Sequence, residues 1–180
     1  MRTRRRLEPR SSEQAPDHAD SAAASPHVAI GEAGSPLPPA FRRWCESRGW
    51  SPRPHQLALL AEAEARRSAL LIAPTGAGKT LAGFLPSLVS AHRRIAAGET
   101  EPDAISTLYV SPLKALAVDI ARNLQAPVTE MGLGVRIETR TGDTPASRRQ
   151  RQRSRPPHIL LTTPEQIALL LSGEDAPYLF

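Results

Sequence analysis

Residues 73–80 read Ala73-Pro74-Thr75-Gly76-Ala77-Gly78-Lys79-Thr80. The stretch lies between an apolar run of strand length, 69–72, and a helical pattern over about 79–96. Gly76 and Gly78 permit backbone angles at which a Cβ would clash, so the amides of the stretch can point into one concavity. Such a nest at a helix N-terminus favours a polyphosphate. The sequence therefore predicts a phosphate-binding loop.

Two side chains at the end of this loop would carry the chemistry of a bound nucleotide. Lys79 can reach the β- and γ-phosphates and the Thr80 hydroxyl can ligate Mg²⁺, so both are candidate catalytic residues. The cofactor-binding residues predicted in the loop are Thr75, Gly76, Ala77, Gly78, Lys79 and Thr80. Ala73 stands where such loops usually begin with glycine. The alternative interpretation is a Gly-rich strand–helix turn that binds nothing.

The rest of the chain alternates between strand and helix patterns. Strands are predicted over 69–72, 105–110, 135–139 and 159–162. Helices are predicted over 79–96, over 113–125 with Pro127 ending it, over 145–153 and over 164–171. Because the strands are apolar rather than alternating, helices should cover both faces of the sheet. The pattern predicts an α/β fold with a mostly parallel sheet.

The N-terminal part divides near residue 35. Residues 1–35 are rich in Pro, Ser, Ala and charges without hydrophobic periodicity, so we expect a disordered tail. From residue 36 onward the pattern becomes that of a domain, 36–180. Phe41, Trp44 and Cys45 follow helical spacing in a helix that Gly49 should end, and Pro54 should open a second helix.

Composition limits the possible partners and compartment. The formal net charge of +5 and the pI of about 10.3 favour an anionic partner such as nucleic acid, although an arginine-rich proteome would give the same values. With Cys45 as its single cysteine, the chain can form no internal disulfide and no thiol cluster for zinc. No apolar run is long enough to cross a membrane. These features fit a protein of the reducing cytoplasm.

Three further segments place polar residues where a predicted strand ends. They are Ser111-Pro112-Leu113-Lys114, Arg140-Thr141-Gly142-Asp143-Thr144 and Thr162-Thr163-Pro164-Glu165. Ser111 can cap the following helix, whose free amides can hold a phosphate. A simple capped helix explains the first segment equally well. The basic run over 148–155 can contact phosphates or form a solvated helix face, and the second interpretation is slightly favoured.

Taken in order, these segments resemble the motif series of a superfamily 2 DExH helicase. The series comprises residues 73–80, 111–117, 141–144 and 162–166. The resemblance covers about 37–180 and is to the large helicase-related (Lhr) group, in particular its ligase-associated DNA damage response DExH-box branch. It implies a P-loop NTPase (RecA-like) fold, ATP and Mg²⁺ as cofactors, and a nucleic-acid partner. No segment shows a read-out of the 2′-hydroxyl that would discriminate RNA from DNA, and the resemblance favours DNA, with a DNA ligase or nuclease of the same repair system as a further partner.

The resemblance also assigns roles to individual residues. Pro52-Arg53-Pro54-His55-Gln56 resembles the Q motif, in which the glutamine recognises adenine; without the family, a solvent-exposed Gln56 at a helix start would be favoured. The residues that the resemblance places on the nucleic-acid backbone are Ser111, Pro112, Lys114, Arg140, Thr141, Gly142, Thr162 and Thr163.

One element of the family's pattern is missing from the sequence. Hydrolysis in this family uses an Asp-Glu pair, which holds Mg²⁺ and activates water, and the chain contains no such pair. We therefore expect the parent protein to be an ATP-dependent helicase and these 180 residues to be a truncated piece that binds ATP without hydrolysing it. A nucleotide-dependent nucleic-acid-binding module without motor activity is the runner-up. A P-loop small-molecule kinase would leave the segments at 111–114 and 162–165 unexplained.

Overall fold

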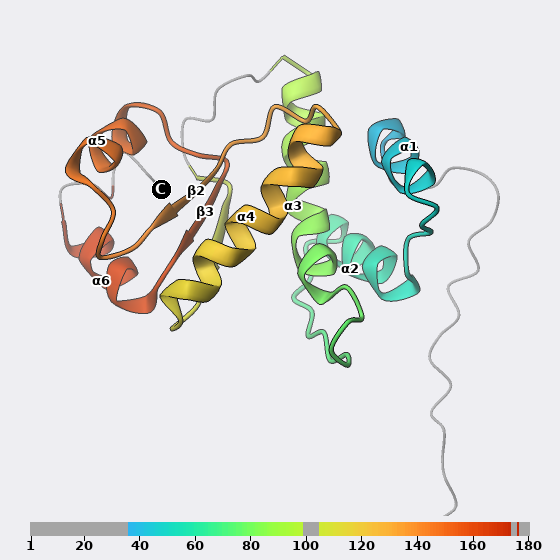
Figure 1. The fold of residues 1–180 in the computed structure, drawn as a ribbon, viewed down its shortest axis with the longest axis horizontal. Coiled ribbons are helices and arrows are strands. Elements are labelled where there is room, and N and C mark those ends of the chain that lie inside the picture. Colours follow the sequence, from blue (N-terminus) through green and yellow to red (C-terminus); the bar gives the residue numbers. More distant parts are fainter. Residues whose placement is uncertain (1–35, 99–104, 174–175, 177–180) are drawn as a thin grey trace, which may run out of the picture.

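A computed structural model describes residues 36–98, 105–173 and 176 of the chain. Its elements are, in chain order, α1 (Pro39–Ser47), α2 (Pro54–Glu64), α3 (Lys79–Ala96), β1 (Thr107–Val110), α4 (Lys114–Glu130), β2 (Ile137–Arg140), α5 (Ala146–Ser154), β3 (Ile159–Thr162) and α6 (Pro164–Ser172). Strands and helices alternate from α3 onward (Figure 1). The predicted α/β class is confirmed.

The three strands form one parallel sheet in the order β1-β3-β2. The central strand β3 is buried along its whole length. Val110 at the end of β1 and Arg140 at the end of β2 are both in register with Thr162 at the end of β3. The three strands therefore finish level with one another, and the loops that follow them leave the same edge of the sheet.

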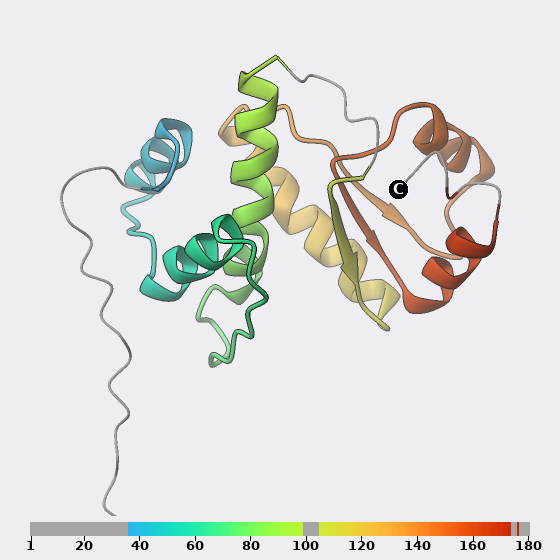
Figure 2. The ribbon, with the colours of Figure 1, turned by 180° about the vertical axis from the view of Figure 1, so that it is seen from behind.

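Helices cover both faces of the sheet, as the apolar strand pattern predicts. Ile159 and Leu161 belong to the main core, to which α4 contributes its buried face. Leu160, whose side chain points to the opposite face, packs in a second cluster with Leu170 of α6. Figures 1 and 2 show α4 on one side of the sheet and α5 and α6 on the other.

The phosphate-loop helix α3 lies beyond α4, and α2 packs against it (Figures 1 and 2). Phe84 of α3 contacts Tyr109 of β1, with 5.5 Å between ring centroids. Gly78 is the N-cap of α3 and has a φ of 74°, in the left-handed region that favours glycine. This conformation lets the chain turn sharply from the loop into the helix.

The strand predicted over 69–72 is wrong for this structure. These residues have no strand pairing, and the side chains of Leu70 and Ile72 are 84% and 86% exposed. A strand needs a hydrogen-bonded neighbour, and β1 pairs only with β3 among the described residues. The apolar run thus lacks the partner that its sequence pattern requires.

The prediction that Pro127 ends its helix is also wrong, because α4 continues to Glu130. Proline removes one backbone donor and usually breaks a helix interior. Here Leu124 and Val128, four residues apart on one helix face, are both buried in the main core. Their burial holds the last turn in place despite the proline.

The other predicted elements are confirmed with shifts of their ends. β3 has the predicted bounds. α5 starts and ends one residue later than predicted, α6 ends one residue later, and β1 and β2 each begin two residues later. Gly49 follows the end of α1 with a φ of 63°. The tail predicted over 1–35 lies outside the described residues. Among the helices of the described part, none is long and apolar enough to span a membrane.

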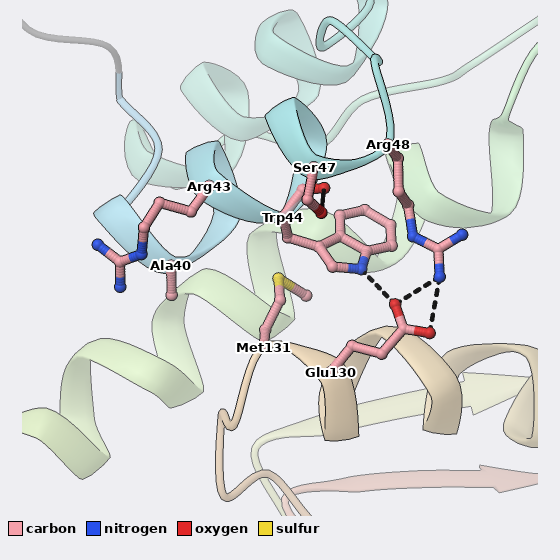
Figure 3. A pocket seen from close by; sticks show the side chains of 7 residues that line it. All are labelled: Ala40, Arg43, Trp44, Ser47, Arg48, Glu130 and Met131. Carbon is pink, nitrogen blue, oxygen red and sulfur yellow. Dashed lines mark hydrogen bonds and ion pairs between the residues drawn. The ribbon is translucent and has the colours of Figure 1, made fainter.

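An ion-pair cluster joins α1 to the end of α4. The Trp44 Nε1 donates to a Glu130 carboxylate oxygen at 2.6 Å, and the Arg48 guanidinium contacts both carboxylate oxygens. Arg48 also lies 5.3 Å from the ring centroids of Trp44 and Trp50. Figure 3 shows the side chains of Trp44, Arg48 and Glu130 along a pocket of about 590 Å³ between the two helices. The cluster fixes α1 against the domain.

This cluster predicts a pH-dependent contribution to stability. The Trp44 and then the Arg48 hydrogen bonds hold the pKa of Glu130 below its usual range. The stabilisation is therefore complete above the ordinary glutamate pKa and is lost as the pH falls through the lowered value. Glu130→Gln should lower the melting temperature slightly at pH 7, and the difference from wild type should shrink in acid. Melting curves between pH 7 and pH 3 measure this difference.

Trp44→Phe provides a check on the cause, because it removes the Nε1 donor and keeps the ring. The pH at which the stabilisation by Glu130 is lost should then rise toward the ordinary pKa of glutamate. A difference between wild type and Glu130→Gln that stays constant with pH would contradict the assignment.

The start of α3 yields a second stability prediction. A Cβ at Gly78 would lie 3.1 Å from the Gln56 Nε2, and the φ of 74° is costly for any other residue. Gly78→Ala should destabilise the domain by about 1–2 kcal/mol in urea unfolding. Gly83→Ala, inside the same helix with no atom within 4 Å of the added Cβ, should stabilise it by up to about 1 kcal/mol. Equal effects of the two changes would contradict this account.

Candidate functional site

The phosphate loop has the backbone form that its glycines predict. Gly76 and Gly78 have φ values of 80° and 74°. Thr75 and Thr80 are exposed, and Ala77 is buried beneath the loop. Thr80 is the second residue of α3, where free backbone amides and the helix dipole favour an anion. The loop therefore presents a hydroxyl and a helix N-terminus to solvent.

The Lys79 side chain folds back over its own loop. Its Nζ donates to the carbonyl oxygens of Ala73 and Pro74, both at 2.8 Å. These contacts satisfy the ammonium group and close the loop into a ring of residues 73–79. A polyphosphate in the loop would offer the same ammonium a charged acceptor, which makes a stronger hydrogen bond than a carbonyl.

The segment that precedes α2 holds the loop from outside. The Arg53 guanidinium donates to the Gly76 carbonyl at 3.2 Å, and the His55 Nε2 lies 2.9 Å from the Ala77 carbonyl oxygen. Sequence reasoning did not single out these two side chains, although both flank the predicted Gln56. Their contacts fix consecutive peptide groups of the phosphate loop.

Gln56 lies beside the loop rather than in solvent. It is 7% exposed, so the solvent-exposed alternative is wrong. Its Oε1 accepts a hydrogen bond from the Arg53 amide at 2.9 Å, and its Nε2 lies close to Gly78. The amide thus links the start of α2 to the phosphate loop. Its predicted contact with adenine stays a prediction.

The loop after β1 contains Ser111, Pro112 and Lys114. Ser111 is not the cap of α4, because Leu113 holds that position and no side chain caps the helix. The Ser111 Oγ accepts instead from the Leu113 amide at 3.2 Å, which tightens the turn before the helix. Pro112 and Lys114 are exposed. Lys114 is the first residue of α4 and presents its charge at the edge of the sheet.

The loop after β2 is a tight turn over Thr141 to Thr144. The Thr141 amide donates to the Thr144 Oγ1 at 2.9 Å. Arg149 of α5 donates to the carbonyls of Thr144 and Gly142 at 2.9 and 3.0 Å, a contact that the sequence did not reveal. Arg140 and Thr141 are 5% exposed, whereas Gly142 is open to solvent. A ligand could reach this turn through the backbone of Gly142 and through the Asp143 side chain, which is 72% exposed.

The loop after β3 contains the two threonines. Thr162 is fully buried, and its carbonyl accepts from the Ser111 amide at 3.0 Å, so it ties two of the loops together. Thr163 is 8% exposed and is the N-cap of α6. The Glu165 backbone amide and then the Thr163 hydroxyl hold the pKa of the Glu165 carboxyl below its usual range. An acidic side chain therefore lies in the first turn of α6, where the helix dipole favours negative charge.

The structure brings the three strand-end loops together and places the phosphate loop nearby. Lys79 and Thr80 line a pocket of about 280 Å³ that Thr107, Leu108 and Tyr109 of β1 close on the other side. Two side chains of the basic run over 148–155 are bound to the domain, since Arg149 donates to the turn described above and Arg151 pairs with Glu138. For the run as a whole, both the phosphate-contact and the solvated-face interpretations stay predictions.

The requirements of Mg²⁺ can be compared with this arrangement. Magnesium prefers oxygen ligands and usually keeps waters and substrate phosphates in its shell. The Thr80 hydroxyl is exposed and supplies one such oxygen. Within 36–98 and 105–173, no group of three or more His, Cys, Asp or Glu side chains could hold a metal ion. Thr80 fits a metal that the nucleotide's phosphates would also ligate.

Comparison with known proteins places this arrangement in a family. Residues 53–178 match the model described as DEAD/DEAH box helicase. The chain is 39% identical over 143 residues to the Lhr helicase/probable uracil glycosylase of Mycolicibacterium smegmatis, covering 73% of this chain and 9% of that protein. It is 40% identical over 148 residues to the Lhr helicase/uracil glycosylase of Escherichia coli, covering 75% and 10%.

Solved structures agree with these relatives. The structure of Mycobacterium smegmatis helicase Lhr bound to ssDNA and AMP-PNP matches with a TM-score of 0.66 and 34% identity, over 77% of this chain and 18% of that chain. The crystal structure of the helicase MrfA bound to DNA matches with a TM-score of 0.66 and 30% identity, over 80% and 19%. The chain therefore spans under a fifth of these proteins. It belongs to the DEAD/DEAH box helicase family and resembles the Lhr-like helicases within it.

Proposed function

We propose that residues 36–180 are the ATP-binding portion of a helicase that uses ATP to move along nucleic acid. The observation that carries the proposal is the phosphate loop at the start of α3, held in place by Arg53 and His55. A loop with exposed amides, a lysine and a threonine suits a nucleoside triphosphate with Mg²⁺. In this proposal, Gln56 contacts adenine, Thr75 to Gly78 surround the phosphates, Lys79 contacts the β- and γ-phosphates, and Thr80 ligates the metal.

The nucleic acid lies along the three strand-end loops in this proposal. Parallel sheets bind ligands at the carboxyl ends of their strands, and the register aligns these ends. The proposed contact residues are Ser111, Pro112, Lys114, Arg140, Thr141, Gly142, Thr162 and Thr163. Five of these residues are buried and would act chiefly by shaping the backbone: Ser111, Arg140, Thr141, Thr162 and Thr163. The DNA in the structures of Lhr and MrfA supports DNA as the substrate.

The finer role follows from the resemblance to the ligase-associated branch. We propose a function in DNA repair in the cytoplasm, alongside a DNA ligase or nuclease. The relatives share the helicase domain and support its nucleic-acid chemistry. Co-purification of the native full-length protein with a ligase or nuclease tests the partner directly.

The 180-residue chain by itself should bind ATP without turning it over. Its sequence has no Asp-Glu pair to hold Mg²⁺ through water and to activate the attacking water. This observation also favours the second candidate, a nucleotide-dependent binding module without motor activity. The two candidates differ in whether the full-length protein unwinds or translocates, whereas both predict binding by this chain.

The two lysines of the chain allow a reciprocal test. Lys79→Ala should weaken binding of a fluorescent ATP analogue by at least tenfold, because a charge-assisted contact to phosphate is lost. Lys114→Ala should leave ATP binding unchanged and weaken binding of single-stranded DNA. Each variant thus serves as the control for the other, and fluorescence anisotropy measures both ligands.

Three outcomes would contradict parts of the proposal. Equal ATP affinity of wild type and Lys79→Ala would remove the phosphate site. Steady ATP hydrolysis by the 180-residue chain, abolished by Lys79→Ala, would show that it carries a complete catalytic centre. ATP binding without any DNA binding would favour a small-molecule kinase.

A further inference from the structure

Lys114 forms an ion pair with Asp143 across the edge of the sheet. Lys114 begins α4 after β1, and Asp143 lies in the turn after β2. Because β3 lies between these strands and all three end in register, the pair links the loops on the two sides of the end of β3. The side chains are 51% and 72% exposed, so the pair is formed in solvent at the proposed nucleic-acid surface.

The turn that carries Asp143 is held on both sides. Thr144 closes it through its contact with the Thr141 amide, and Arg149 binds the carbonyls of Gly142 and Thr144. The residues that flank the exposed Gly142-Asp143 pair, Thr141 and Thr144, are both buried. The carboxylate is thus presented to Lys114 by a fixed backbone.

The Asp143 carboxylate resembles a nucleic-acid phosphate in its chemistry. Like a phosphate, it is a single anion that accepts from the Lys114 ammonium at the N-terminus of α4, where the helix dipole also favours negative charge. Exposed ion pairs are weak, so another anion can replace the carboxylate. A strand that binds Lys114 must displace Asp143 and must then lie beside its released negative charge.

We propose that Asp143 competes with a nucleic-acid phosphate for Lys114 and so limits the affinity of this surface for single strands. The inference rests on the proposed function and adds an opposing residue to the contact residues named there. A lowered affinity for each phosphate suits a surface that must release that phosphate before the strand can advance. The acidic side chain thereby offsets part of the attraction that the basic chain has for any polyanion.

The test measures binding of a labelled oligo-dT strand to the 180-residue chain at several salt concentrations. Asp143→Asn keeps the shape of the side chain and removes its charge. It should tighten binding by up to about fivefold at low salt, the limit set by an exposed ion pair. The gain should shrink as the salt concentration rises, because salt screens interactions between exposed charges. Asp143→Ser should behave alike.

Asp119→Asn is the matched control. Asp119 lies on α4, is 63% exposed and pairs with Arg122 at 4.0 Å, so the change in net charge is the same. Its effect should be clearly smaller than that of Asp143→Asn. In a Lys114→Gln background, Asp143→Asn should have no effect beyond that of Asp119→Asn, and melting curves confirm that each variant is folded.

The possible failures are distinguishable. If wild type binds oligo-dT and Asp143→Asn binds it with the same affinity, this inference is overturned and the proposed function stays intact. A gain that persists without Lys114 also overturns it, because it would reflect general repulsion. Absence of binding by every variant overturns the proposed function and this inference with it.

Discussion

The parallel register of β3 between β1 and β2 is the constraint on which the rest of the domain depends. It places Val110, Thr162 and Arg140 level with one another, so three segments far apart in the sequence emerge side by side. The contacts between the loops follow from this alignment, including the bond from the Ser111 amide to the Thr162 carbonyl. A shift of one residue would exchange the faces of Leu160 and Leu161, which pack in different clusters, and would misalign the three loops.

Two kinds of residue form the edge of the sheet that is proposed to bind nucleic acid. Buried polar groups, such as Thr141, Thr144 and Thr162, shape the loops from inside. Exposed groups, such as Lys114 and Asp143, present charge to solvent. In the proposed function, the buried groups would set the shape of the surface, and the exposed charges would set its affinity for nucleic acid. Changes to an exposed charge can therefore alter binding without disturbing the fold, whereas changes to the buried threonines affect both.

The sequence allowed the elements to be predicted where local pattern decides them. The four residues of β3, three of them apolar, and the helix that begins at Lys79 were located correctly, because apolar runs and glycines act on local structure over short distances. Pro127 and the run over 69–72 were misjudged, since both depend on tertiary contacts: the first on core burial, the second on a neighbouring strand. The motif residues were visible as a pattern, but the roles of Arg53, His55 and Arg149 were not. Their side chains act on backbone carbonyls of other segments, and a sequence does not state which carbonyl lies within reach.

The absence of strand pairing over 69–72 gives the contacts of Arg53 and His55 a further meaning. In an α/β sheet, a strand normally fixes the start of the loop that follows it, but Leu70 and Ile72 make little contact with the described residues. The loop nevertheless has defined glycine conformations. The Lys79 Nζ holds the carbonyls of Ala73 and Pro74, and further contacts come from the loop's other side. That side is α2, which packs on α3 and directs two side chains onto consecutive loop carbonyls. The same segment carries Gln56, so whatever binds Gln56 acts on the group of contacts that shapes the phosphate loop. In the proposed function, recognition of a base by Gln56 would therefore be linked to the shape of the phosphate loop through the first turn of α2.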